Sequence, residues 1–168
     1  MPDGTIANRI DLRPCVAADI PGLMEGLNDW RVAQWLPTVP FPYTEDDARG
    51  FIAAVAQTTP PNALAVVHRP EGQFLGVVGL ARSGDVAELG YWLLPRFHGR
   101  GLMAEAVARV LEHQVGALAT VFATVDKGNA ASIKLLDRSG LRLVGEHVRA
   151  TPNRQGNVVV LRYQKDFR

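Results

Sequence analysis

The sequence is poor in cysteine, in net charge and in long apolar runs. Its one cysteine, Cys15, excludes an internal disulfide and is consistent with a reducing cytoplasm, where we expect the protein to be. A net charge of +1 leaves no electrostatic footprint for nucleic acid. No apolar run is long enough to cross a membrane, and the N-terminus lacks the basic and apolar segments of a secretory signal. We therefore expect neither nucleic acid nor a membrane as a partner.

Metal chemistry also has little support in the sequence. No spacing of histidine, cysteine, aspartate and glutamate predicts a metal site. Cys15 lies in an early strand pattern without a histidine nearby in the chain, which favours a buried structural cysteine over a nucleophile. The remaining composition, 168 residues with 47% apolar and 21% charged, is typical of a globular protein with a sizeable core. We expect a single domain over residues 1–168.

Hydrophobic periodicity divides the chain into strands and helices. Bulky apolar and alternating segments predict strands at 10–14, 64–68, 73–81, 86–94, 120–125, 141–149 and 158–163. Helical spacing and capping residues predict helices after Asp19, over 28–36, from Thr44 to about Gln57, and over 101–114 and 129–139. Tight turns join three consecutive strands into an antiparallel meander, and the whole order predicts a mixed α/β domain.

The segment 88–106 is the most informative part of the chain. An apolar strand stops at Pro95, the loop Arg96-Phe-His-Gly99-Arg-Gly101 follows, and a helical pattern begins at once. The first amides of a helix lack partners, and glycines allow the backbone to approach an anion closely. The loop therefore predicts a pyrophosphate cradle. An ordinary strand–turn–helix connection is the alternative that the loop alone leaves open.

The loop and two other segments indicate which phosphate-containing ligand the cradle would bind. The loop lacks the Lys-Ser/Thr of a Walker A motif and the third glycine of a dinucleotide fingerprint. It resembles the Arg/Gln-x-x-Gly-x-Gly/Ala segment of the GNAT superfamily of acetyl-CoA-dependent N-acetyltransferases. The segment 129–141, in which an asparagine opens a helix that ends at glycine, is similar to that family's second CoA segment. The segments 30–37 and 42–48 resemble the Rim-type branch, which acetylates the N-termini of ribosomal proteins.

The resemblance implies a fold and a co-substrate. The fold would be GNAT-like, with a central, mostly antiparallel seven-stranded sheet splayed between its fourth and fifth strands and flanked by helices. Acetyl-CoA would bind in the gap, with no metal. The implied CoA contacts are Leu93, Leu94, Arg96, Phe97, His98, Gly99, Arg100, Gly101, Leu102, Met103, Asn129 and Ser132.

Acetyl transfer requires a neutral amine, a stabilised carbonyl oxygen and a leaving thiolate. Glu88, an acid within an otherwise apolar strand, is the first candidate for the base, and an outward-facing strand glutamate is the alternative. Ser132 is the candidate on the thiolate side, because Leu136 stands where many family members carry a tyrosine; a serine bonded to its own helix is the alternative. The resemblance implies that an amide near Leu93 or Leu94 binds the carbonyl oxygen.

The acceptor implied by the resemblance is a primary amine, either a protein N-terminus or a small amine, attacking directly in a ternary complex. We expect Trp30, Trp35 and Tyr43 to form an aromatic wall over it, with ordinary core positions as the alternative. His147 lies next to the expected substrate loop and, like an ordered water, is an alternative to Glu88 as the base; an ordinary strand position is its other interpretation. A non-catalytic CoA-binding module is the alternative function. Such a module would need the cradle and Asn129, but neither Glu88 as a base nor Ser132 held in place for the thiolate. Homodimerisation through the late strands or the proline-rich loop stays open.

Overall fold

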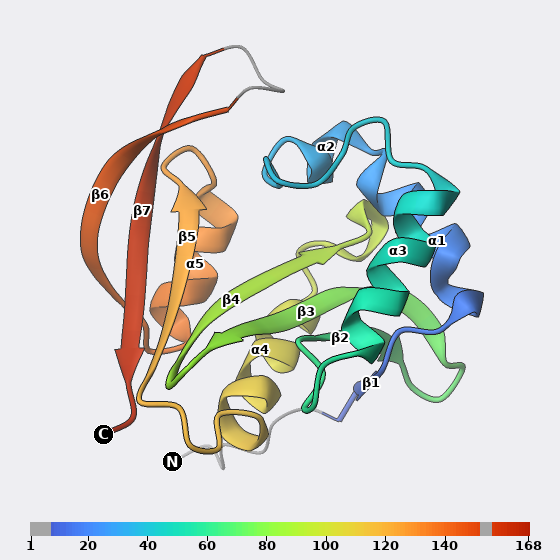
Figure 1. Cartoon of the computed structure of the whole chain (residues 1–168), viewed down its shortest axis with the longest axis horizontal. Coiled ribbons are helices and arrows are strands. Elements are labelled where there is room, and N and C mark those ends of the chain that lie inside the picture. The colour runs from blue at the N-terminus through green and yellow to red at the C-terminus, as the bar shows by residue number, and fades with distance from the viewer. Residues whose placement is uncertain (1–7, 152–155) are drawn as a thin grey trace.

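The computed structural model describes residues 8–151 and 156–168, and its centre is a twisted sheet with helices on both faces (Figure 1). The seven strands lie in the order β1-β2-β3-β4-β5-β7-β6, and the neighbouring pairs are antiparallel except β4–β5, which is parallel. The strands are β1 (Ile10–Arg13), β2 (Ala63–His68), β3 (Gln73–Ser83), β4 (Val86–Leu93), β5 (Thr120–Asp126), β6 (Arg142–Ala150) and β7 (Asn157–Asp166). The predicted mixed α/β fold with a mostly antiparallel seven-stranded sheet is confirmed.

Among the described residues, five α-helices cover the sheet in two layers, each with its own hydrophobic core. They are α1 (Ile20–Leu27), α2 (Trp30–Ala33), α3 (Glu45–Ala56), α4 (Leu102–His113) and α5 (Ala130–Arg138), with short 3-10 turns η1 (Ala17–Asp19) and η2 (Pro95–Phe97). The apolar faces of α4 and α5 pack with one face of the sheet, and those of α1, α2 and α3 pack with the other. Both faces of the meander are therefore buried, which explains its nearly continuous apolar sequence.

The sheet opens between β4 and β5, as the resemblance implied. The two strands pair over Val86–Glu88 opposite Thr120–Phe122. Beyond that vertex β4 stays with β3 as far as Leu93, whereas β5 stays with β7 as far as Asp126. Figure 1 shows the two strands diverging from their shared end, with α2 near the open end of the gap. Backbone groups along the diverging edges are thus available to something other than a neighbouring strand.

Two helix starts follow their predicted caps. The Thr44 hydroxyl accepts a hydrogen bond from the Asp47 amide at 3.1 Å, and the Asp47 carboxylate accepts one from the Thr44 amide at 2.8 Å. This reciprocal capping box begins α3. At α5, the Asn129 side-chain oxygen accepts from the Ser132 amide at 3.2 Å. This second cap holds Asn129 and Ser132 together at the start of α5, beside the gap.

Asp19 differs from its predicted role as the cap of α1. Its carboxylate binds the Arg13 guanidinium with two contacts of 2.7 Å and accepts from the Val16 amide at 2.9 Å. The side chain is almost fully buried, and a buried carboxylate without a cationic partner would be strongly destabilising. Asp19 therefore pairs with Arg13 instead of capping α1. The helix predicted over 28–36 is also shorter, because α2 covers only Trp30–Ala33. The expectation about a secretory signal falls largely on residues 1–7, and 152–155 of the predicted β6–β7 loop also lie outside the described residues.

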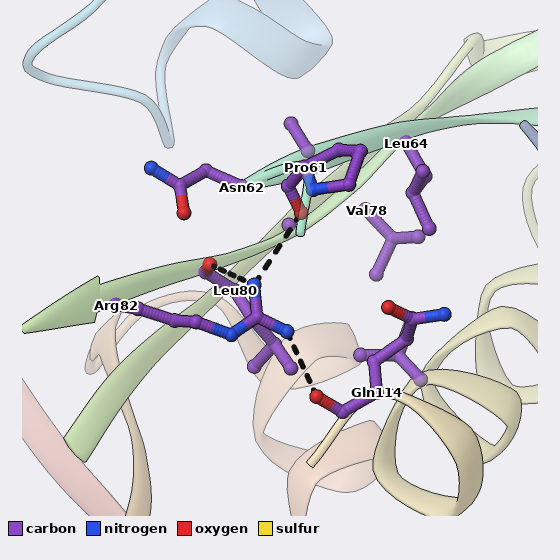
Figure 2. A pocket seen from close by; sticks show the side chains of 10 residues that line it. Pro61, Asn62, Leu64, Val78, Leu80, Arg82 and Gln114 are labelled. Atoms are coloured by element: carbon purple, nitrogen blue, oxygen red, sulfur yellow. Dashed lines mark hydrogen bonds between the residues drawn. The ribbon is translucent and has the colours of Figure 1, made fainter. Parts of the chain in front are cut away.

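A small hollow of about 10 Å³ lies where β2 and β3 meet the end of α4 (Figure 2). Arg82 reaches across it and donates to the carbonyl oxygen of Gln114 at 2.8 Å and to that of Pro61 at 3.4 Å. Gln114 is the C-terminal cap of α4, so the guanidinium neutralises the negative end of that helix. The hollow holds no more than about one water molecule, which excludes it as a site for a substrate.

Candidate active site

A cavity of about 540 Å³ occupies the gap between β4 and β5, a volume typical of a ligand site. Its walls come from β4, β5, α5, the start of α4 and the segment around α2. Of the predicted CoA contacts, the cavity is lined by Leu93, Phe97, His98, Gly99, Gly101, Leu102, Met103, Asn129 and Ser132. The structure thus brings together the loop and the α5 cap, which lie about thirty residues apart in the sequence.

The glycine loop has a backbone that only glycine adopts without strain. Gly99 has φ of 74° and Gly101 has φ of 72°, both in the left-handed region, and Gly101 is the N-cap residue of α4. No atom lies within 4 Å of a Cβ built on Gly99, so its conformation rather than a close contact calls for glycine there. The turn directs the start of α4 at the cavity, and its free amides are suited to an anion.

The exposed edge of β4 presents its backbone to the gap. The Leu94 amide donates to the Leu75 carbonyl at 2.8 Å and is therefore occupied by β3. Successive amides of a strand point in opposite directions, so the Leu93 amide points away from β3, toward the gap. The Leu93 carbonyl accepts a hydrogen bond from the His98 ring at 2.8 Å. Of the two amides considered for the carbonyl oxygen, that of Leu93 has the required direction.

Ser132 bonds across the gap rather than to its own helix. Its hydroxyl lies 2.6 Å from the Tyr91 hydroxyl, and both residues line the cavity. Burial raises the pKa of Tyr91 to about 12, so the phenol stays neutral. Leu136, which occupies the usual tyrosine position of this helix, is fully buried. Sequence reasoning missed Tyr91, which resembled one more apolar residue of the β4 strand.

Glu88 lies at the vertex of the splay and is exposed. It forms the last β4–β5 pair, opposite Phe122, before the strands diverge. Side chains of a strand alternate between the two faces of the sheet, so Glu88 lies on the same face as Trp92, four residues later. The Trp92 ring packs against Gly26 of α1, which places Glu88 on the α1–α3 face. Glu88 lies outside the residues that line the cavity. Of the residues that the structure describes, Asp126 supplies the carboxylate of that lining, and it accepts from the Gly128 amide at 2.7 Å.

The structure separates the four residues predicted for the acceptor. Trp35 lines the cavity, and its ring lies beside Gly128 at the start of the α5 segment. Trp30 is half exposed and packs against Phe41, with ring centroids 5.4 Å apart. Tyr43 is buried in the core beside α1 and α3, where burial raises its pKa to about 12. His147 is exposed on β6.

Three predicted CoA contacts lie outside the cavity lining. Arg96 forms an ion pair with Glu25 of α1, which ties the loop to that helix. The carbonyl oxygen of Arg100 accepts from Arg9 at 2.8 Å. Leu94 is buried in the core under α4.

The three cations Arg31, Lys134 and Arg138 of the cavity lining were missed, and the first of them, on α2, forms an ion pair with Asp29 at 2.6 Å. Lys134 and Arg138 line the cavity from α5, and both are exposed. Their i,i+4 spacing places them on the same helix face, a signal that the sequence contained. Together with the start of α4 they give the cavity a positive lining suited to phosphate groups.

The other buried reactive groups are committed to structure. Cys15 is buried, as predicted, and burial raises the pKa of its thiol to about 11. Glu105 of α4 is buried but binds the Arg9 and Arg109 guanidinium groups, each at 3.1 Å. Within residues 8–151 and 156–168, no cluster of His, Cys, Asp or Glu is grouped to hold a metal ion, and no helix is long and apolar enough to cross a membrane.

Comparison with solved structures shows the same fold in known acetyltransferases. A GNAT-family acetyltransferase from Bacillus anthracis has a TM-score of 0.83 at 21% identity, covering 95% of this chain and 96% of that chain. The Salmonella typhimurium enzyme that modifies the N-terminal serine of a 50S ribosomal protein has a TM-score of 0.78 at 19% identity, covering 97% and 98%. Spermidine N-acetyltransferase from Vibrio cholerae, in complex with CoA and spermine, has a TM-score of 0.81 at 16% identity, covering 95% and 96%.

Sequence comparison gives the family. No curated protein matches the chain. Residues 9–142, most of its length, match the family described as the acetyltransferase (GNAT) domain. The resemblance drawn from the loop and the α5 segment is thereby confirmed, and the chain belongs to the GNAT family of acetyltransferases.

Proposed function

We propose that this acetyltransferase moves the acetyl group of acetyl-CoA to a primary amine, by direct attack in a ternary complex in the cytoplasm. The observation that carries the proposal is the cavity of about 540 Å³ that joins the left-handed glycine loop to the α5 cap. The loop amides and the cations Lys134 and Arg138 suit the phosphates of CoA. The apolar Leu102 and Met103 and the open edge of β4 suit its pantetheine arm.

The chain's own residues supply the chemistry as follows. The Leu93 amide donates to the carbonyl oxygen as negative charge develops there. Glu88, at the vertex, takes the proton of the amine directly or through water, approached from the α1–α3 face. Ser132 faces the departing sulfur from the first turn of α5. Trp35 closes the side of the cavity from which the amine enters.

The charge of the lining favours one class of amine over another. In the described part of the chain, one carboxylate, that of Asp126, lines the cavity; of the lining cations, Arg31 is paired with Asp29, and Lys134 and Arg138 are those assigned above to the phosphates of CoA. A polyamine with several positive charges gains little attraction from such a surface, whereas a peptide carries a single amine at its N-terminus. The Salmonella neighbour acts on a protein N-terminus and the Vibrio neighbour on spermidine. We therefore place N-terminal peptides before polyamines as acceptors.

The first test is calorimetric titration of the protein with acetyl-CoA and with CoA. Micromolar binding that Gly99→Glu abolishes supports the site, because the substitution puts a bulky anion in the loop. No binding by folded protein, or unchanged affinity of Gly99→Glu, refutes it. An acceptor screen with N-terminal peptides and spermidine then follows, with the free thiol of CoA as the readout.

The base is tested by Glu88→Gln, with Glu112→Gln, an exposed glutamate of α4, as the matched control. We expect Glu88→Gln to lower kcat by about 10²-fold or more and to flatten the pH–rate profile, with acetyl-CoA affinity unchanged. Full activity of Glu88→Gln would show that another group is the base. Asp126→Asn then tests the carboxylate that lines the cavity.

A further inference from the structure

The hydroxyl pair formed by Tyr91 and Ser132 is the one polar contact that bridges the two walls of the splay inside the cavity, among the residues that the structure describes. Tyr91 comes from β4, on the same strand parity as the buried Leu89 and Leu93, and so faces the layer of α4 and α5. Ser132 comes from the first turn of α5, where its amide is held by Asn129. Both hydroxyls are therefore held by rigid elements.

The 2.6 Å contact between the two hydroxyls allows either of them to be the donor. The Tyr91 oxygen also lies 3.5 Å from the Ser132 carbonyl oxygen, which can only accept, so the phenol hydrogen has acceptors of Ser132 on that side. When Tyr91 donates to the serine oxygen, the serine's own hydrogen is turned away from Tyr91. That hydrogen is then free to point into the cavity.

From this geometry we infer that Tyr91 is a positioning residue of acetyl transfer: it donates to Ser132 and so directs the serine hydroxyl at the sulfur that leaves. The inference rests on the proposed function. A chain of two hydroxyls polarises along its length, so the serine becomes a stronger donor than it would be alone. The tyrosine missing at Leu136 of α5 is thus replaced in effect by one from β4.

The step balances without a proton from either hydroxyl. As the amine nitrogen bonds to the acetyl carbon, the carbon–sulfur bond breaks and its electron pair passes to sulfur. The amine gives its proton to the base and then to solvent. The thiolate accepts a hydrogen bond from Ser132 while it leaves, and it takes its proton from solvent afterwards. The Tyr91 phenol stays neutral throughout, because burial disfavours the phenolate.

A purely structural alternative is that the pair only fastens β4 to α5. The two roles differ in what happens to a bound thiol. If Ser132 donates to sulfur, the thiolate of bound CoA is stabilised and the thiol pKa falls below that of free CoA. A fastening role leaves the thiol pKa unchanged, because nothing is then directed at the sulfur.

The experiment titrates the thiol of CoA bound to the whole protein by its thiolate absorbance, with CoA lacking sulfur as the blank. Four proteins are compared: wild type, Tyr91→Phe, Ser132→Ala and the double variant. Tyr163→Phe, which removes a buried tyrosine hydroxyl on β7, is the matched control. Denaturation midpoints show that each variant is folded before it is titrated.

We expect wild type to lower the pKa of the bound thiol by about one unit, a tenfold gain in thiolate. Tyr91→Phe should lose at least about half a unit, a threefold loss, and Ser132→Ala should lose the whole shift. The double variant should match Ser132→Ala, because Tyr91 acts only through the serine. Tyr163→Phe should match wild type. With an acceptor in hand, Tyr91→Phe should lower kcat and leave the KM for acetyl-CoA unchanged.

The outcomes separate this inference from the proposed function. Failure of folded wild type to bind CoA removes the proposed function and the inference with it. CoA binding with the same thiol pKa in wild type and Tyr91→Phe overturns the inference alone. A Ser132→Ala protein whose bound thiol keeps the wild-type pKa also overturns the inference, and this outcome decides the question even where Tyr91→Phe fails to fold.

Discussion

The conformation of the glycine loop can be tested by one pair of substitutions. Gly99 and Gly50 are both glycines at which an added Cβ would meet no atom within 4 Å. They differ in backbone, because Gly99 has φ of 74° whereas Gly50 lies within α3. Alanine therefore adds no clash at either position, and any difference in the free energy of unfolding reports the backbone conformation alone.

The expected effects have opposite signs. A left-handed conformation costs an L-residue about 1–2 kcal/mol, partly offset by the lower entropy of the unfolded chain, so Gly99→Ala should destabilise by about 1 kcal/mol. Gly50→Ala should stabilise by about 0.5–1 kcal/mol, because alanine suits a helix interior. At about 2–4 °C per kcal/mol for a chain of this size, the two melting temperatures should differ by roughly 3–8 °C.

The assay is thermal unfolding, checked by the urea midpoint of the same variants at constant m-value. The strain at Gly99 falls on the loop that faces the cavity, so we also expect weaker CoA binding by Gly99→Ala than by Gly50→Ala. A Gly99→Ala protein as stable as Gly50→Ala would refute the reasoning, since it would mean that the loop does not hold Gly99 in the left-handed region.

Three further predictions concern the rest of the chain. Asn129→Ala removes the cap bond to Ser132 and should cost about 1 kcal/mol of unfolding free energy by urea titration, which Asn129→Asp should restore. The Cys15 thiol, with its pKa raised to about 11, should not react with Ellman's reagent in the native protein. Because the folded state holds this proton more tightly than the unfolded state, the free energy of unfolding should fall between pH 9 and 11, more steeply than in Cys15→Ala. Arg82→Met leaves the Gln114 carbonyl unpaired and should cost about 1–3 kcal/mol, measured by thermal unfolding.

Local signals in the sequence were sufficient for much of the fold. The capping pattern at Thr44 and the apolar runs of β2, β3 and β4 are confirmed because each depends on residues close together in the chain. The splay between β4 and β5 came from the family resemblance, since no periodicity records where two strands diverge. Asp19 shows the opposite case. Its spacing favoured a cap, but burial beside Arg13 decided its partner.

The site divides in the same way. The glycines at 99 and 101 could be predicted because a left-handed turn is a local requirement. Tyr91 could not, because its partner Ser132 lies 41 residues away and strand periodicity only marks it as apolar. The choice between the Leu93 and Leu94 amides likewise depends on which of them β3 occupies. Lys134 and Arg138 carried an i,i+4 signal that went unused.

The geometry of β4 explains how one strand can serve both reactants. Side chains alternate between faces, so Glu88 lies toward the α1–α3 layer and Tyr91 toward the α4–α5 layer. Backbone groups alternate in the plane of the sheet, so the Leu93 amide points into the gap between them. The proposed base, oxygen site and thiolate site thus lie in three directions from one rigid element. A slip of one residue in the β3–β4 register would exchange the two faces and turn the amide back toward β3, so the proposed chemistry depends on the same register as the core.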